Sequence, residues 1–84
     1  MNPIRFTSHA KLQCVECGVS ENEVILSIRS GKWEAAKYGR KMYRRNFPFN
    51  AMWSGKHYAV KQAAPVVKEE QSEIVVITVY SYYF

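Results

Sequence analysis

The sequence contains no aspartate, and all seven of its acidic residues are glutamates. Magnesium-dependent nucleases hold their metal with clustered carboxylates, so this absence argues against that class. A phosphate-cradling Gly-rich loop, a metalloprotease HExxH motif and a nucleophile elbow are absent as well. If the chain cleaves RNA, it must therefore do so without a metal, and we expect neither a metal nor an organic cofactor.

Cysteine is scarce, with only Cys14 and Cys17, which form a single C-x-x-C pair. A redox pair of this kind needs a strand directly before it and a helix that begins at it, whereas this pair falls inside a predicted helix. A zinc site needs about four ligands, and there is no second cysteine pair. We therefore expect two buried or half-buried thiols that bind no metal.

Long apolar runs are also lacking. The longest, from Ile74 to Val79, has the length of a strand and includes Thr78, which is far below the roughly 20 apolar residues of a membrane-spanning helix. The N-terminal segment is interrupted by Arg5 and His9 and does not resemble a signal peptide. The expectation is a cytoplasmic protein without membrane association.

The composition is that of a small globular domain. With 84 residues the chain forms one domain, residues 1–84, and its 48% apolar and 23% charged residues favour folding over disorder. Twelve Lys and Arg residues against seven Glu give a net charge of +5. This charge fits a polyanionic partner, either nucleic acid or an acidic protein, and it fits equally a basic surface that serves solubility alone.

The first predicted helix begins after a short apolar lead-in. Thr7 or Ser8 can cap it, it runs to about Cys17, and Gly18 supplies the left-handed residue that closes it. On a helical wheel His9, Gln13 and Glu16 fall on one polar stripe. The apolar stripe beside it consists of Ala10, Cys14 and Cys17.

The second predicted helix has the clearest start signal. Ser20 and Glu23 form a capping box, and Val19 and Val24 stand at the two positions of a hydrophobic staple. Gly31 is expected to end the helix.

The rest of the chain has the pattern of strands. We expect strands at 33–38, 41–47, 57–63 and 74–84, with Pro48 and Pro65 ending the second and third and Ser54-Gly55 forming a turn within a loop. The last strand should be central, because its first half is apolar on both faces. The fold class is therefore α+β, with two N-terminal helices packed on an antiparallel sheet. The predicted core consists of Leu12, Val15, Val24, Ile28, Val75 and Ile77.

A cluster of cations follows the helices. Lys and Arg hold phosphates and aromatic rings stack on unpaired bases, so the cluster predicts a nucleic-acid-binding surface. The alternative is a charged outer face that protects the sheet against edge pairing. The cations and rings lie within nine residues and continue on the next strand: Lys37, Tyr38, Arg40, Lys41, Tyr43, Arg44, Arg45, then Lys56, His57 and Lys61.

Several segments together resemble a family of small bacterial proteins, domain-of-unknown-function family 4258 (DUF4258). They are Arg5-Phe6-Thr7-Ser8-His9-Ala10, Glu16-x-Gly18-Val19-Ser20, Val24-Ile25, Gly39-Arg40, Gly55-Lys56 and Ile74-Val75-Val76-Ile77-Thr78-Val79-Tyr80. The resemblance implies the fold of barnase-like, colicin-like and RelE-like RNase toxins, with the helices on a curled antiparallel sheet of about four strands. It also implies that His9 belongs to the active site. The family usually carries Arg where Gln13 and Cys17 stand here, which weakens phosphate binding on the first helix.

Two functions from different classes follow. The first is a metal-independent, toxin-like RNase in which His9 acts as general acid or base, Glu16 shares its helix face, and Tyr80 or Tyr82 orients the substrate or donates a proton. The second is a non-catalytic RNA-binding or protein-interaction domain that uses the same basic, aromatic sheet. A toxin would be held by an acidic antitoxin-like protein, which the net charge suits. The predicted nucleic-acid contacts are Lys11, Arg40, Lys41, Arg44, Arg45, His57 and Lys61.

Overall fold

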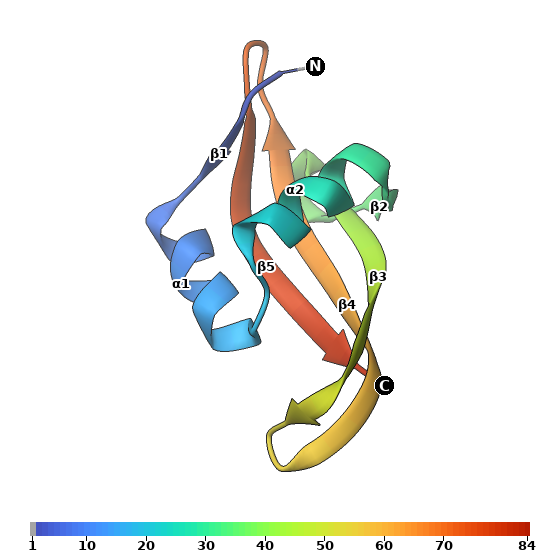
Figure 1. Ribbon diagram of the computed structural model, residues 1–84. Coiled ribbons are helices and arrows are strands. Elements are labelled where there is room, and N and C mark those ends of the chain that lie inside the picture. The colour runs from blue at the N-terminus through green and yellow to red at the C-terminus, as the bar shows by residue number, and fades with distance from the viewer. Residues whose placement is uncertain (1) are drawn as a thin grey trace.

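The computed structural model describes residues 2–84 and shows an α+β domain. Figure 1 shows both helices on the same side of a twisted sheet. Neither helix within the described residues has the length and apolar character that crossing a membrane requires. The elements in chain order are β1 (Ile4–Phe6), α1 (Ser8–Cys17), α2 (Glu21–Ser30), β2 (Lys32–Ala35), the 3₁₀ turn η1 (Lys37–Gly39), β3 (Lys41–Trp53), β4 (Lys56–Glu69) and β5 (Ile74–Tyr83).

The sheet has five strands in the order β1-β5-β4-β3-β2. The prediction of a curled antiparallel sheet of about four strands is wrong in its details, because the sheet is mixed and not curled. The additional strand is β1, the short apolar lead-in, which pairs in parallel with Ile74–Val76 of β5. The central strand is β4 and not, as predicted, the last strand, although β5 is paired on both sides, with β4 and β1.

Both helices begin and end where their local signals predict. The Thr7 hydroxyl accepts a hydrogen bond from the backbone of Ala10, and Gly18 closes α1 with a left-handed φ of 69°. Ser20 and Glu23 form the complete capping box of α2, which ends at Gly31.

The prolines do not end their strands, contrary to prediction. At Pro48, β3 has an open side because β2 pairs only as far as Arg44, so the missing N–H of proline breaks no ladder there. The β3–β4 ladder passes from the pair Met42–Val66 to the pair Arg45–Ala63, and Pro65 lies in the gap. The segment predicted as a loop around Ser54-Gly55 is therefore the end of a long hairpin, although its turn is placed correctly.

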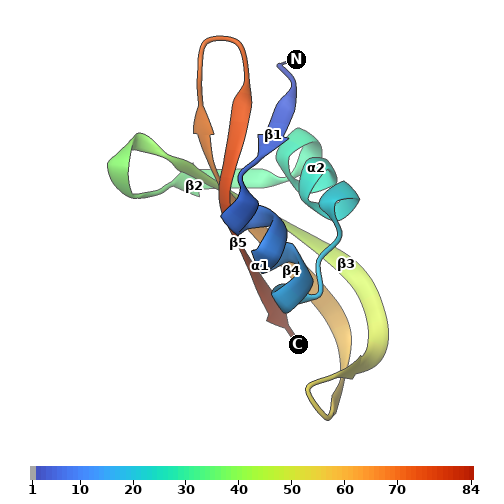
Figure 2. The same ribbon diagram turned by 90° about the vertical axis from the view of Figure 1, so that its left-hand side faces the viewer.

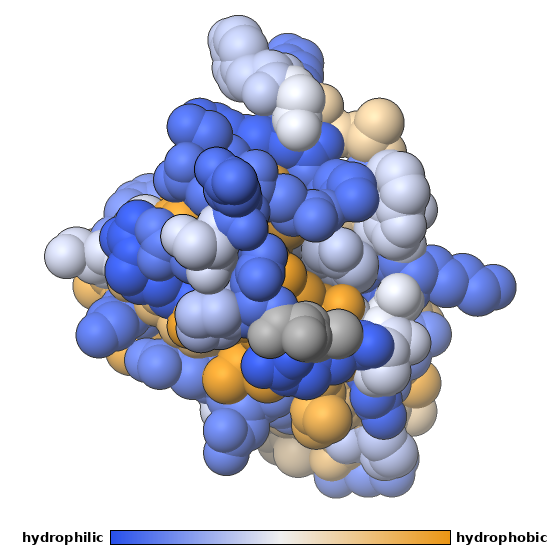
Figure 3. Space-filling view, turned by 90° about the horizontal axis from the view of Figure 1, so that it is seen from above, coloured by the Kyte–Doolittle hydropathy of each residue, from blue (hydrophilic) through white to orange (hydrophobic). Residues whose placement is uncertain are grey.

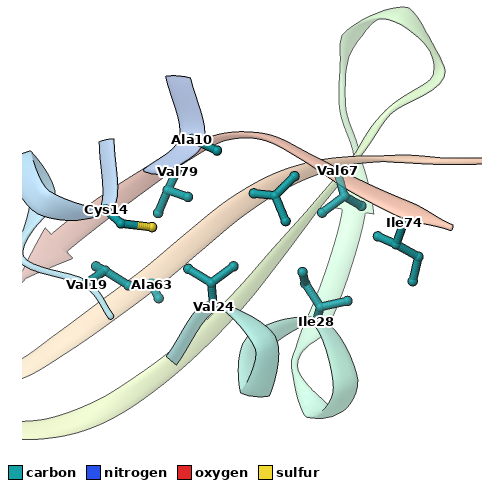
Figure 4. Packing of buried hydrophobic residues seen from close by; sticks show 10 residues of the cluster. Ala10, Cys14, Val19, Val24, Ile28, Ala63, Val67, Ile74 and Val79 are labelled. Carbon is teal, nitrogen blue, oxygen red and sulfur yellow. The ribbon is translucent and has the colours of Figure 1, made fainter. Parts of the chain in front are cut away.

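The core lies between the helices and one face of the sheet (Figure 4). Val24, Ile28 and Val75 are buried as predicted. Leu12 and Val15 are 55% and 78% exposed, so their assignment to the core is wrong. The small side chains of the neighbouring stripe face the sheet instead, which lets α1 approach β5 closely. The buried cluster is Ala10, Cys14, Val19, Val24, Ile28, Ala63, Val67, Ile74, Val76 and Val79.

Candidate nucleic-acid interface

A pocket of about 500 Å³ lies on the face of the sheet that the helices leave uncovered. Side chains alternate along a strand, so Val66 and Tyr80 point away from the core residues Val67 and Val79. Figure 2 shows the turn between β2 and β3 extending away from the helices, toward this uncovered side. We call this hollow the open-face pocket. Its lining is Glu34, Ala35, Ala36, Lys37, Tyr38, Arg40, Met42, Arg44, Val66, Thr78 and Tyr80.

Arg44 is the most strongly oriented cation of the open-face pocket. Its Nε donates to Glu34 Oε1 at 2.7 Å, and its Nη1 donates to Gln62 Oε1 at 2.9 Å. The guanidinium carbon lies 5.4 Å from the ring centroid of Tyr82, within the range of a cation–π contact. The hydrogen bond to Glu34 raises the pKa of Arg44 above its ordinary value. The pocket therefore holds an oriented guanidinium, paired with Glu34, whose remaining donors can bind an anion.

His9 reaches the border of the open-face pocket from α1. Its Nε2 lies 3.2 Å from Oγ1 of Thr78, which lines the pocket. The start of α1 is fixed to β5, because the Thr7 backbone N–H donates to Val76 O and the Thr7 hydroxyl donates to Ile77 O. Since β1 pairs with β5 no further than Val76, the edge of β5 at Thr78 is accessible to the imidazole.

The other predicted catalytic residues lie at different distances from this contact. Tyr80 lines the pocket, and Tyr82 follows it on the same face beside Arg44. Glu16 is exposed on α1 and does not line the pocket. The structure thus groups His9 with the tyrosine strand and leaves Glu16 apart.

The predicted nucleic-acid contacts do not form one surface. Arg40 and Arg44 line the open-face pocket, whereas Lys61 is only 8% exposed on the opposite, helix-packed face. Lys61 Nζ donates to Gly18 O and pairs with Glu23 Oε1, both at 2.9 Å. Its role is structural, so we remove it from the binding site.

Two further predicted cations also lie on the helix-packed face. Lys41 pairs with Glu69 and lies 4.2 Å from the ring centroid of Trp33. Arg45 donates to the hydroxyl of Ser30 at the end of α2. Of the remaining two, Lys11 is exposed on α1 and His57 is exposed at the far end of the β3–β4 hairpin.

A second hollow of about 440 Å³ adjoins the first at Arg44. It lies where β2 begins and is lined by Ser30, Gly31, Lys32, Arg44, Arg45, Asn46 and Gln62. Seen from the end of the molecule in Figure 3, hydrophilic side chains dominate the surface and apolar ones form small separate areas.

Sequence reasoning missed Glu34, Met42 and Thr78 as parts of the site. Thr78 carries the one detectable signal, since it is a polar residue within the apolar run of the last strand. Glu34 joins the site only because β2 pairs with β3 in the register that sets it opposite Met42. Single-sequence patterns do not specify that register.

The two cysteines are free thiols in α1, with Cys14 buried and Cys17 half-buried. Burial raises the pKa of Cys14 to about 11. The thiol of Cys17 lies 3.5 Å from the carbonyl oxygen of Val79. Within residues 2–84, His, Cys, Asp and Glu side chains form no group of three or more that could hold a metal ion.

Comparison with known proteins gives no relative: no family model, no curated protein and no solved structure matches the chain.

Proposed function

We propose that the chain is a metal-independent, toxin-like RNase that binds single-stranded RNA in the open-face pocket and uses His9 as its general acid or base. The observation that supports this most is the contact between His9 and Thr78, because it sets an imidazole beside a pocket that carries cations. Imidazole is the side chain best suited to exchange a proton near neutral pH. The resemblance of several segments along the chain to DUF4258 also implies that His9 is part of the site.

The reaction that these groups can perform is an intramolecular transesterification. A base removes the proton of the ribose 2′-hydroxyl, and the 2′-oxygen attacks the adjacent phosphorus. The bond from phosphorus to the 5′-oxygen breaks, and an acid gives that oxygen a proton. The products are a 2′,3′-cyclic phosphate and a 5′-hydroxyl, and no metal or water enters this step.

Each role has a candidate group at the pocket. His9 serves as the base or the acid, and the phenol of Tyr80 is the second proton-transfer group. Arg40 and Arg44 stabilise the charge that develops on the phosphate. Tyr82 orients Arg44 through the ring contact described above.

The second candidate is a domain that binds RNA or an acidic, antitoxin-like protein without catalysis. The observation in its favour is that Arg44 already bonds to Glu34 and Gln62, so part of its hydrogen-bonding capacity is used inside the protein. DUF4258 proteins usually carry arginine at the positions of Gln13 and Cys17. The lack of these two cations also favours binding without catalysis. Such a domain would use the same face and the same net charge of +5.

A cleavage assay in EDTA separates the two candidates. We expect the wild type to cleave single-stranded RNA to products with 2′,3′-cyclic phosphate ends, and His9→Gln to lower the rate by about 10²–10⁴-fold. His57→Gln is the matched control, because His57 is exposed at the far end of the hairpin. Binding without cleavage on any RNA, including ribosome-bound message, would favour the second candidate. Loss of activity in His57→Gln alone would show that the site is assigned to the wrong histidine.

A further inference from the structure

The turn that overhangs the open-face pocket is strained at an aromatic residue. The Arg40 N–H donates to Lys37 O, which closes a two-residue turn between β2 and β3. Its central residues both have positive φ, 63° at Tyr38 and 71° at Gly39, as in a type I′ turn. Asn or Gly is preferred at the first of these positions, and a bulky side chain is rare there.

No burial compensates for this strain, since Tyr38 is 88% exposed. The ring contacts the side chain of Arg40, whose guanidinium carbon lies 5.7 Å from the ring centroid. Lys37, Tyr38 and Arg40 all line the open-face pocket. The turn therefore holds an exposed aromatic ring, backed by a cation, at the border of the pocket.

We propose that Tyr38 is the base-stacking residue of this pocket and receives one unpaired base of a bound RNA strand. This inference rests on the proposed function and names the part of the substrate that the pocket recognises. Exposed aromatic rings stack on any base without pairing to it, and a neighbouring arginine adds a cation–π contribution. A strained, exposed tyrosine contributes little to folding, so contact with a ligand accounts for its position better than packing does.

The charges around Tyr38 favour a nucleic acid over a protein as its partner. Three cations line the open-face pocket, Lys37, Arg40 and Arg44, against the single carboxylate of Glu34. A base that stacks on Tyr38 carries a phosphate on either side of its ribose. Those phosphates are then close to the cations of the same turn and strand.

The test compares a strand with bases against an abasic strand that has the same number of phosphates. Measured by fluorescence anisotropy, the wild type should bind a short oligoadenylate more tightly than it binds the abasic strand. Tyr38→Asn should weaken oligoadenylate binding about tenfold and remove the preference for bases. Tyr38→Phe retains the ring and should bind like the wild type.

A stability measurement distinguishes this role from a structural one. Asn tolerates positive φ, so Tyr38→Asn should leave the Tm unchanged or raise it while it weakens binding. Ser54→Asn is the matched control, because Ser54 has a φ of 51° in the other tight turn, before Gly55. That variant should show a similar change in Tm and an unchanged Kd for RNA.

The outcomes separate this inference from the proposed function. If the wild type prefers the strand with bases and Tyr38→Asn does not, the stacking role is supported even where no cleavage occurs. If Tyr38→Asn binds both strands as the wild type does, the stacking role is overturned while RNA binding stands. If the wild type binds neither strand at low salt, both the stacking role and the RNA function are overturned.

Discussion

The imidazole of His9 and the hydroxyl of Thr78 lie 3.2 Å apart, although 69 residues separate them in the sequence. The contact joins the first turn of α1 to the edge of β5, just beyond the end of β1. It is the point at which the helix layer and the open face of the sheet meet. The hydroxyl can therefore hold the imidazole toward the pocket.

Removing this hydroxyl should lower catalysis without unfolding the protein. Thr78→Val keeps the branched side chain and deletes the hydrogen-bonding partner of His9, so we expect RNA cleavage to fall about tenfold to a hundredfold through misorientation. Single-turnover cleavage is the measurement, with Tm as the control for folding. Thr78→Ser should restore most of the rate. An unchanged rate in Thr78→Val would show that the contact does not position His9.

The ion pair of Lys61 and Glu23 should make part of the stability dependent on pH. Burial alone would raise the pKa of Glu23, but hydrogen bonds from Ser20 and Lys61 outweigh burial and hold this pKa below its ordinary value of 4.5. A carboxyl group whose pKa is lowered by folding stabilises the fold at pH values above its ordinary pKa. This stabilisation is lost as the pH falls through the lowered pKa.

Lys61→Met should therefore destabilise the protein by roughly 2 kcal/mol near neutral pH, because it leaves Glu23 without its charged partner. The difference from the wild type should shrink as the pH falls below about 4.5. Urea unfolding at several pH values measures both effects. Lys56→Met is the control, since Lys56 is an exposed lysine at the start of the same strand. A constant difference across the acid range would contradict the coupling.

The helix ends could be predicted from the sequence because their signals are local. Thr7, Gly18 and the Ser20–Glu23 capping box satisfy backbone groups within a few residues of themselves. The proline positions could not be predicted in this way. Whether Pro48 ends a strand depends on whether another strand lies beside it, and that is decided by the distant segment β2.

The site was predictable only in part, for a similar reason. Arg44 and Arg45 are neighbours in the sequence, but alternation along β3 sends them to opposite faces. Composition shows that cations are abundant, whereas only the packing of α2 shows which face remains open. Alternation along the last strand places Thr78, Tyr80 and Tyr82 on one face, and the structure has Thr78 and Tyr80 in the open-face pocket.

Gly31 should tolerate no side chain, because α2 ends against the backbone of β3. A Cβ at this position would collide with the carbonyl oxygen of Ser27 and would lie 2.7 Å from that of Arg44. Both are backbone atoms, so Gly31→Ala should destabilise the protein by about 2 kcal/mol or more. Chemical denaturation measures this effect. A Cβ at Gly55 would meet open space, and only the φ of 81° disfavours alanine there. A larger loss of stability in Gly55→Ala than in Gly31→Ala would contradict the packing argument.

Cys14 should be nearly inert toward thiol reagents in the folded protein. Burial raises its pKa to about 11, so little reactive thiolate exists near neutral pH. In a Cys17→Ser variant, alkylation at pH 7.5 should be at least about a hundredfold slower than in denaturant. The rate should rise about tenfold per pH unit as the pH increases. Rapid stoichiometric labelling of the folded variant would show that Cys14 is accessible.

The salt dependence of RNA binding should reveal which face of the sheet carries the phosphates. Each phosphate neutralised on a single strand contributes about −0.7 to the slope of log K against log salt concentration. If Lys37, Arg40 and Arg44 each neutralise one phosphate, the slope of the wild type is about −2. Arg44→Gln should flatten the slope by about 0.7, because it removes one cation. Arg44→Lys should keep the slope but weaken binding at every salt concentration, because lysine lacks the planar fork of donors.

Lys41→Gln is the matched control for this experiment. It removes the same charge three residues earlier, but Lys41 lies on the helix-packed face beside Glu69 and Trp33. Its slope should therefore equal that of the wild type. Equal flattening by Arg44→Gln and Lys41→Gln would mean that RNA responds to the overall charge of the protein and not to the pocket. That result would remove Arg44 from the site, because a specific phosphate contact requires the face on which the cation lies to matter.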